Sequence, residues 1–278
     1  MSTNENALVA YTPTINLPAL APDSGEIMMI MQENLNGLGT IKFPKVKMPS
    51  GGAAFFSMIN EEGKPKPHET IEGIIISRVP HKVWYAKSYN EKGKDDIGIP
   101  DCYSADCITG TGYQDPETGL WVIPKGQKCE TCPKNQWGSH RKGGRGKDCN
   151  DKIRIHDLLE GSLFPIVIDL TPTSIGNFKD YVTRLTNKVK HFSSVVTVIG
   201  LEQDENAAGT EYSKATFGKS RELTKEESAK IRAYIKTLEP YMVQITRENL
   251  AEDITDADRE TIDAEVVEGT TIKGNQAF

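Results

Sequence analysis

The pattern of hydrophobic and polar positions along the chain predicts a protein built mostly from short strands. β-branched and aromatic residues concentrate in short runs bounded by Gly, Pro, Asn or Asp, which is typical of strands between turns. The predicted strands cover residues 70–77, 82–89, 152–158, 164–170, 192–201 and 212–217. Val79-Pro80-His81 lies between the first two, so we expect a hairpin there.

Two segments follow the helical period instead. After the start signal Thr171-Pro172-Thr173-Ser174, apolar residues recur at helical spacing between positions 175 and 188. Residues 224–238 predict a second helix, because Thr224 and Glu227 have the spacing of a capping box. These elements together predict a β-rich α+β fold.

The chain divides by composition. Residues 1–25 are rich in Pro, Thr, Asn and Ala and predict an extended N-terminal arm, and the apolar stretch 27–31 fits a strand or a helical turn. Residues 26–246 form the expected domain, which a segment at about 100–150 interrupts. Residues 247–278 predict a disordered C-terminal tail, because they are acidic with only scattered apolar positions.

Composition narrows the class of protein. With 37% hydrophobic and 26% charged residues, the chain has the make-up of an ordinary globular protein. We see no apolar run near the roughly 20 residues of a membrane helix, and the N-terminus lacks the layout of a signal peptide. We therefore expect a cytoplasmic protein that does not contact membranes, in which clustered cysteines serve as metal ligands rather than disulfides.

All five cysteines fall within residues 102–149. Cys129-x2-Cys132 lets two sulfurs from one tight turn reach the same zinc ion. We expect Cys102 and Cys149, which flank this pair at comparable distances, to complete a structural Zn²⁺ site.

Other donors compete for the metal. Cys107 is the alternative to Cys102, and His140 and His156 are further possible ligands, although a histidine in a basic loop such as His140 is expected to be solvated. Reduced, unliganded cysteines are the competing interpretation. A catalytic zinc is less consistent with this pattern, because it usually keeps one position open for water.

Positive charge concentrates in the same segment. Between positions 125 and 147 only Glu130 opposes seven basic residues, namely Lys125, Lys128, Lys134, Arg141, Lys142, Arg145 and Lys147. Cations that follow a phosphate backbone, with aromatic side chains that stack on bases, are what single-stranded nucleic acid requires. We expect the stacking residues to be Trp137 with Trp84 or Tyr85, and at most one of the adjacent Trp84 and Tyr85 can face a groove.

The acidic excess lies in the tail. Residues 247–278 carry nine acidic and three basic side chains, which accounts for the whole net charge of −6. Such a tail can occupy a cationic groove until nucleic acid displaces it. Its end, Ala277-Phe278, resembles the ends of bacterial single-stranded-DNA-binding proteins, which predicts a contact of Phe278 with partner proteins.

The order of these features resembles phage single-stranded-DNA-binding proteins of the T-even helix-destabilising type. Four segments carry the resemblance: 100–104, 129–133, 147–149 and 164–170. The resemblance implies an OB-fold-like barrel with a zinc-binding insertion, binding of single-stranded DNA in replication or recombination, and contacts of the tail with replication proteins. The classical phage protein uses three cysteines and a histidine, where we propose four cysteines as ligands in this chain.

Two other functions remain open from the sequence. We find no Walker loop, no H-E-x-x-H and no deaminase H-x-E, which favours a protein that is not an enzyme. A metal-dependent nuclease or nucleotide-modifying enzyme is one alternative, with Asp101, Asp106 and Asp115 near the metal. A zinc-containing adaptor of the replication or transcription machinery is the other, and RNA is the alternative ligand to DNA.

Overall fold

The computed structural model describes residues 20, 24–37, 43–46, 48–49, 52–59, 64–87, 99–141, 143, 145–205, 211–242 and 250. The helices are α1 (Ser24–Leu35), α2 (Pro172–Asn187) and α3 (Lys225–Leu238). The strands are β1 (Lys45–Val46), β2 (Phe56–Ile59), β3 (Pro65–His68), β4 (Ile71–Trp84), β5 (Cys102–Ser104), β6 (Tyr113–Gln114), β7 (Trp121–Ile123), β8 (Asn150–Leu159), β9 (Ile166–Leu170), β10 (Val195–Glu205) and β11 (Glu211–Glu222). Most of the predicted arm and nearly all of the predicted tail lie outside these residues.

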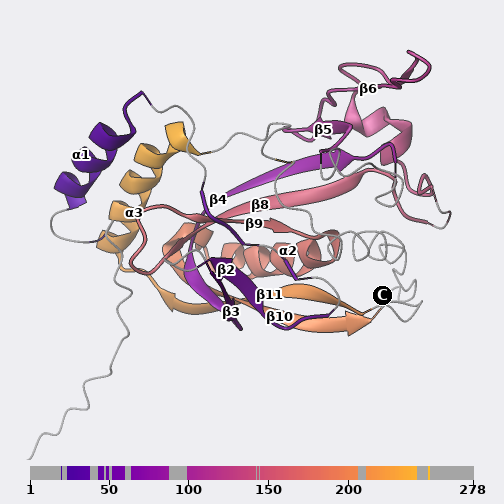
Figure 1. The fold of residues 1–278 in the computed structure, drawn as a ribbon. Coiled ribbons are helices and arrows are strands. Elements are labelled where there is room, and N and C mark those ends of the chain that lie inside the picture. Colours follow the sequence, from indigo (N-terminus) through magenta and orange to yellow (C-terminus); the bar gives the residue numbers. More distant parts are fainter. Residues whose placement is uncertain are drawn as a thin grey trace, which may run out of the picture.

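One large sheet organises the molecule (Figure 1). Its seven strands follow the order β1-β9-β8-β4-β10-β11, and β5 pairs with the far end of β4. β1 pairs with β9 in parallel, whereas the other pairs are antiparallel. The sheet curls into a half barrel, so the predicted β-rich α+β class is confirmed.

The predicted hairpin at Pro80 is wrong, because β4 runs without a break through that residue. Pro80 pairs with Ile153 of β8. On the other side of β4, β10 covers only residues 71–73 and β5 only residues 82–84. Among the described residues no strand pairs with that side of β4 at Pro80, so β4 has an open edge there, and proline is tolerated at strand edges.

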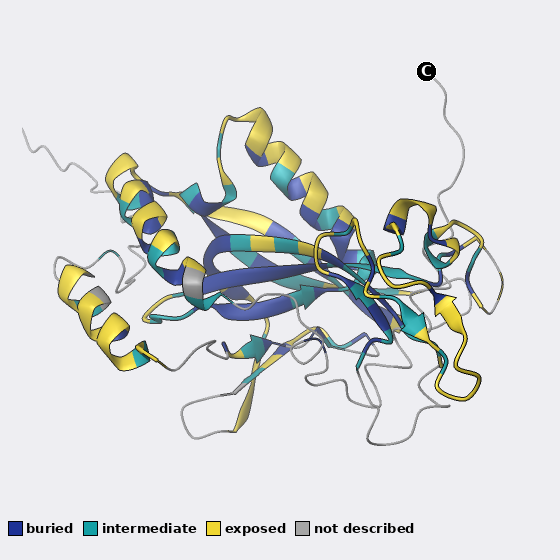
Figure 2. Ribbon diagram, turned by 90° about the horizontal axis from the view of Figure 1, so that it is seen from above, coloured by how far each residue is buried: buried dark blue, intermediate teal, exposed yellow. Residues whose placement is uncertain are grey.

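Helix α2 covers the concave face of the sheet, as its apolar period predicts. Ile175, Phe178 and Leu185 are buried against residues of β8, β9 and β11, which include Ile168 and Phe217. Figure 2 shows the central strands in dark blue and the outer faces of the helices in yellow. Apolar side chains of α2 and of the sheet are buried against each other here, and they form the main hydrophobic core.

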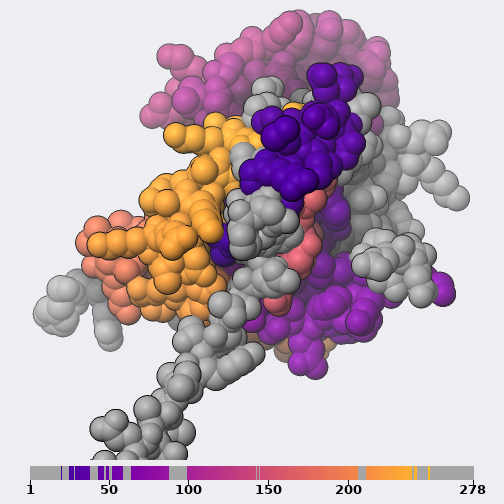
Figure 3. All heavy atoms as spheres, turned by 90° about the vertical axis from the view of Figure 1, so that its left-hand side faces the viewer, coloured from indigo at the N-terminus to yellow at the C-terminus, as the bar shows by residue number. Residues whose placement is uncertain are grey.

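A second core lies on the other side of the sheet, beneath α3 and α1. Tyr234 and Ile231 of α3 pack with Met31 of α1, and Figure 3 shows α1 in indigo beside the orange α3. The predicted capping box is confirmed, since Thr224 and Glu227 exchange both hydrogen bonds. The stretch 27–31 belongs to α1, which settles the alternatives of strand and helical turn in favour of a helix.

The cysteine-containing insertion, residues 99–149, leaves the sheet between β4 and β8 and stands at one end of the molecule (Figure 1). Leu250 also reaches this end, where it is buried against Val83 and packs with Val79, Tyr85 and Tyr103. The first part of the predicted tail thus contacts the domain. No helix among the described residues is both long and apolar enough to cross a membrane.

Candidate metal centre and adjoining groove

Cys129 and Cys132 lie on a tight turn that the backbone stabilises. Cys129–Thr131 form a 3-10 turn, and the Cys132 N–H donates to the Cys129 carbonyl at 3.3 Å. A second 3-10 turn, Pro133–Asn135, follows directly. The Asn135 side chain folds back and donates through Nδ2 to the same Cys129 carbonyl at 2.7 Å. The C-x2-C turn that the sequence predicts is therefore present.

Backbone contacts bring the two distant cysteines to this turn. The Gly110 N–H donates to the Gln127 carbonyl at 2.9 Å, and the Cys149 N–H donates to the Lys134 carbonyl at 2.8 Å. A Cβ atom on Gly110 would lie 3.2 Å from the Cys102 Sγ. The absence of a side chain at Gly110 thus allows its backbone to lie close to Cys102.

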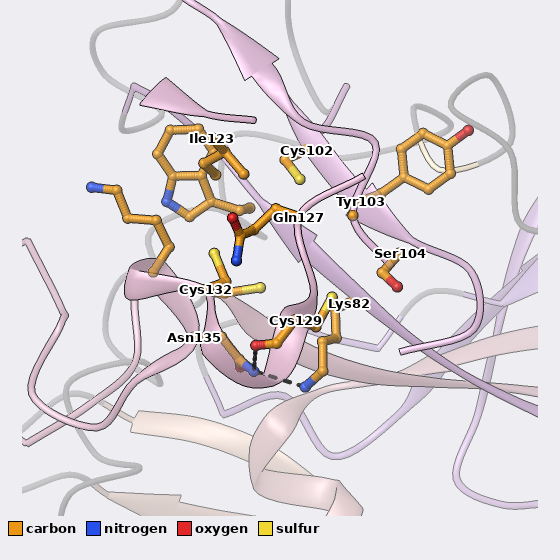
Figure 4. Close-up of a pocket in the computed structure, with 13 residues that line it drawn as sticks. Lys82, Cys102, Tyr103, Ser104, Ile123, Gln127, Cys129, Cys132 and Asn135 are labelled. Atoms are coloured by element: carbon orange, nitrogen blue, oxygen red, sulfur yellow. Dashed lines mark hydrogen bonds between the residues drawn. The ribbon is translucent and has the colours of Figure 1, made fainter. Parts of the chain in front are cut away.

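The four cysteines predicted as zinc ligands line one small cavity (Figure 4). Cys102 comes from β5, Cys129 and Cys132 from the C-x2-C turn, and Cys149 from the position before β8. The cavity measures about 20 Å³. Since roughly 10–15 Å³ accommodates a water-sized occupant, the space suits a single ion. Four sulfur donors of this kind are a typical structural zinc set.

The electrostatics of the thiols agree with a buried cluster. Burial raises the pKa of the Cys149 thiol, and negative charge on Cys102 or Cys129 acts in the same direction. Burial likewise raises the pKa of Cys102, and charge on Cys132 adds to this. Without a metal these two thiols stay neutral, so an ion has to displace their protons.

The side chains do not form a finished coordination sphere. Across the described part of the chain, no group of three or more His, Cys, Asp or Glu side chains is placed so that it could hold a metal ion. Coordination would therefore need side-chain rearrangement around the cavity. The donor types and their common cavity fit zinc, whereas the positions of the sulfurs are not those of a bound site.

The alternative donors do not line the cavity. Cys107, with φ of 61°, lines a larger groove beside the insertion. His156 is fully buried in the domain, where its ring packs edge-on against Phe43. His140 is 8% exposed, with Nδ1 3.3 Å from the Gly143 carbonyl oxygen. The expectation of a solvated His140 is therefore wrong, because the loop folds back over it.

Asp148 joins the insertion to β4. The Trp84 Nε1–H donates to Asp148 Oδ2 at 2.7 Å, and the Arg141 Nε–H donates to Oδ1 at 2.8 Å. Burial alone would raise the pKa of Asp148, but these hydrogen bonds and the nearby Lys134 lower it below its ordinary value. Trp84 is 3% exposed and packs beside the cysteine cavity. The Trp84 ring therefore has no accessible face on which a base could stack, so the stacking role predicted for Trp84 is wrong.

Arg141 also donates hydrogen bonds to backbone carbonyls that follow β4. Its Nη1–H donates to the Ala86 carbonyl at 3.1 Å, and its Nη2–H donates to the Tyr85 carbonyl. The half-buried Tyr85 side chain packs with the cluster around Leu250, while Trp84 joins the cysteine cluster. The two adjacent aromatic residues thus point in opposite directions, as the strand geometry predicts.

These contacts predict that Arg141 stabilises the insertion rather than binding phosphate. Arg141→Ala should lower the free energy of unfolding by about 2 kcal/mol, because Asp148 would lose a charge-assisted partner while staying buried. Urea unfolding measures this effect. Arg145→Ala is the matched control, because Arg145 lies on the same loop and its side chain makes no hydrogen bond or ion pair with the described residues, unlike Arg141. Equal stability of the two variants would contradict the assignment.

A groove of about 1230 Å³ separates the insertion from α2 and the β10–β11 strands. The insertion contributes Trp137 and Lys147 to one wall, and the floor comes from β4 and β8. Trp137 is 65% exposed, and the Lys147 Nζ lies 5.2 Å from its ring centroid. Among the described residues, five cationic side chains line this groove: Arg78, Lys147, Lys152, Lys179 and Lys214.

Two carboxylates, Asp151 and Asp204, also line the groove. Asp151 pairs with Lys147 at 3.3 Å, and Asp204 forms an ion pair with Lys214. Such partly exposed pairs are weak, so a phosphate group could replace either carboxylate as the partner of the lysine. The described lining residues keep an excess of positive charge.

The structure separates the residues predicted to bind nucleic acid or partners by whether they line the groove. Lys147 and Trp137 line the groove, whereas Lys125, Lys128, Lys134 and Arg145 are not among its lining residues. Lys134 lies 3.6 Å from Asp148. Lys142 and Phe278 lie outside the described residues.

Four groove cations were not predicted from the sequence: Arg78, Lys152, Lys179 and Lys214. They come from β4, β8, α2 and β11 and are scattered over more than a hundred positions, so no local charge cluster marks them. The only signal is the exposure of a lysine on the amphipathic helix α2, which is too common to indicate a site.

The carboxylates of the enzymatic alternative stabilise local backbone instead of lining the cysteine cavity. Asp106 Oδ1 accepts hydrogen bonds from the Ile108 and Thr109 N–H groups, both at 2.8 Å. Asp115 accepts from the backbone of the turn that follows it. Asp101 Oδ2 accepts from the Ala86 N–H at 2.7 Å. These contacts are typical of turn-forming aspartates.

Comparisons with protein-family models, curated proteins and solved structures each found no match to this chain. The resemblance to phage single-stranded-DNA-binding proteins thus stays a prediction from the residues and their order.

Proposed function

We propose that this protein binds single-stranded DNA in the groove between its insertion and α2, without catalysing a reaction. The observation that carries the proposal is the groove itself, in which five cations meet an exposed tryptophan. A positive groove follows the phosphate backbone of a strand, and an aromatic ring stacks on bases with little sequence preference.

The insertion is proposed to hold a structural zinc ion through Cys102, Cys129, Cys132 and Cys149. Cys149 lines both the cysteine cavity and the groove, while Trp137 and Lys147 lie between Cys132 and Cys149 in the chain. A metal that fixes both ends of this segment would therefore fix one wall of the groove. The zinc ion would have this positioning role rather than a chemical one.

The roles of the sheet and the tail are proposed from the resemblance to phage single-stranded-DNA-binding proteins. The curled sheet would serve as an OB-like barrel, and the acidic tail with Phe278 would contact replication or recombination proteins in the cytoplasm. The cationic groove and the acidic tail are opposite in charge. RNA is the alternative ligand, because cations and a stacking ring do not distinguish the two sugars.

The salt dependence of binding tests the electrostatic part. If five cations contact phosphates, the logarithm of the affinity for a fluorescent oligonucleotide of about thirty nucleotides should fall against the logarithm of salt with a slope of about −3 to −4. Fluorescence anisotropy with DNA and RNA strands of the same sequence measures the slope and the preference for sugar. A slope near zero would remove the electrostatic basis of the proposal.

Charge reversal on α2 tests the location. Lys179→Glu should weaken binding at least tenfold, because Lys179 is exposed and lines the groove. Lys188→Glu is the matched control, since Lys188 is exposed just after the same helix but is not among the groove-lining residues. At 0.1 M salt each introduced charge is screened over about 10 Å, so each variant reports on DNA bound near the substituted residue. Equal losses in both variants would contradict binding in this groove.

A further inference from the structure

The β6–β7 hairpin exposes apolar side chains that the fold does not cover. Leu120 is 69% exposed, Trp121 50% and Val122 45%. Trp121 and Val122 are neighbours in β7 and point to opposite faces, so each face exposes an apolar side chain at this end of the strand, whereas Ile123 at the other end is buried in the cluster around Trp84. Exposed apolar side chains on a strand are typical of an association surface.

The hairpin also has an unused edge. β6 and β7 form a two-stranded sheet of their own, apart from the large sheet. Within the described ranges no further strand pairs with β7, so one row of its backbone groups is open to a partner strand. The label β6 in Figure 1 marks the hairpin, which projects from the insertion on the side away from β10 and β11.

The charges around this strand run in a definite order. Asp115 and Glu117 precede the apolar residues 120–123, and Lys125 and Lys128 follow them. A strand that pairs with a second copy of itself in antiparallel orientation sets the acidic turn of each copy beside the lysines of the other. The surface is therefore complementary to itself, which is the condition for a two-fold symmetric interface.

We propose that two copies of this protein associate through β7 in antiparallel orientation. Apolar contacts of Trp121 and Val122 would be enclosed by two acid–lysine contacts related by the two-fold axis. Glu117 pairs with Lys87 at 3.4 Å, but both side chains are more than half exposed, so this weak pair can be exchanged for an intermolecular one. Lys125 and Lys128, which do not line the groove, thereby have a role.

The association should be weak and reversible, because a single short strand offers a small interface. Interfaces below about 1,200 Å² are typical of transient complexes. Sedimentation velocity without nucleic acid, over a range of protein concentrations, should show a monomer–dimer equilibrium with a dissociation constant on the order of micromolar. A chain that stays monomeric throughout a range up to hundreds of micromolar would overturn the proposal.

Exchange of charges tests the orientation. Lys125→Glu/Lys128→Glu and Glu117→Lys/Thr118→Lys should each weaken self-association about tenfold, since like charges then face one another across the axis. An equimolar mixture of the two variants should associate again, because each acidic segment meets a basic one. If the mixture stays monomeric while the wild type dimerises, the antiparallel arrangement is wrong.

A pair of tryptophan variants separates this inference from the proposed function. Trp121→Ala should lose self-association and keep its affinity for a short oligonucleotide that holds one protein, whereas Trp137→Ala should do the reverse. Both tryptophans are at least half exposed in the insertion, so neither change removes a core contact. Unchanged self-association in Trp121→Ala would overturn the inference, and unchanged DNA affinity in Trp137→Ala would count against the groove instead.

Discussion

Cys132→Ser should abolish stoichiometric zinc binding and unfold the insertion. A serine hydroxyl is a poor zinc ligand, and structural zinc sites stabilise small modules by on the order of 10 kcal/mol. The β5–β7 segment buries few apolar residues, chiefly Ile123 and the cysteines themselves, which pack against Trp84 of β4. Metal analysis of the purified variant measures the first effect. Loss of the low-temperature step in thermal unfolding, or a fall in its midpoint, measures the second.

Cys107→Ser is the control for this variant, since Cys107 faces the groove rather than the cysteine cavity. It should keep the full zinc content and the melting behaviour of the wild type. Substitution of Co²⁺ for zinc gives a spectroscopic measure of how many thiolates bind in each variant. Zinc retained in Cys132→Ser but lost in Cys107→Ser would show that the ligand set is wrong.

Metal loss should also weaken DNA binding, because the metal site and the groove share a wall. Trp137 and Lys147 lie on the segment between the third and last proposed ligands, Cys132 and Cys149. Once this segment is free, ordering it on the strand costs conformational entropy of about 1–2 kcal/mol per residue. The large sheet should keep its fold, since its cores on both faces do not involve the insertion.

The sequence predicted the features that depend on neighbouring residues. The capping box at Thr224 and Glu227 is a contact across three positions, and it forms as expected. The Cys129–Cys132 turn is equally local. The gathering of Cys102 and Cys149 at that turn could be expected only from zinc chemistry, since no local pattern connects residues so far apart.

Features that depend on which strands become neighbours could not be predicted. Pro80 predicted a turn, yet it lies within β4. It pairs with β8 on one side, and no described strand pairs with β4 on the other side at this position. Trp84 looked like a stacking platform, but Asp148, 64 positions later, binds its indole N–H in the interior. The groove could not be predicted for the same reason, because its cations come from distant positions and meet only after the sheet and α2 have packed.

Asp157→Asn should make the protein more stable above neutral pH. Asp157 is fully buried on β8, and neither carboxylate oxygen has a hydrogen-bond partner among the described residues. It lies against the Gly73 backbone, and the nearby hydroxyls of Tyr181 and Thr197 bond to each other at 2.8 Å. Burial without a partner raises the pKa of Asp157 to about 7.

The direction of the pH effect follows from this raised pKa. The protonated form is favoured in the folded state, so its stabilisation is complete below the ordinary pKa of 3.8 and is lost as the pH rises through about 7. A pKa difference of this size corresponds to about 4 kcal/mol, which is an upper bound because water can enter around an ionised side chain. Asparagine has nearly the same shape and cannot ionise.

The difference in unfolding free energy between the wild type and Asp157→Asn should therefore increase by about 2–3 kcal/mol between pH 5 and pH 8.5, and most of this increase should fall below pH 7. Taking this difference at each pH cancels the buried histidines His81 and His156, whose pKa values burial lowers to about 4. Asp180→Asn, an exposed carboxylate of α2, is the control and should give a flat difference. A flat profile for Asp157→Asn as well would mean that Asp157 is hydrated in solution.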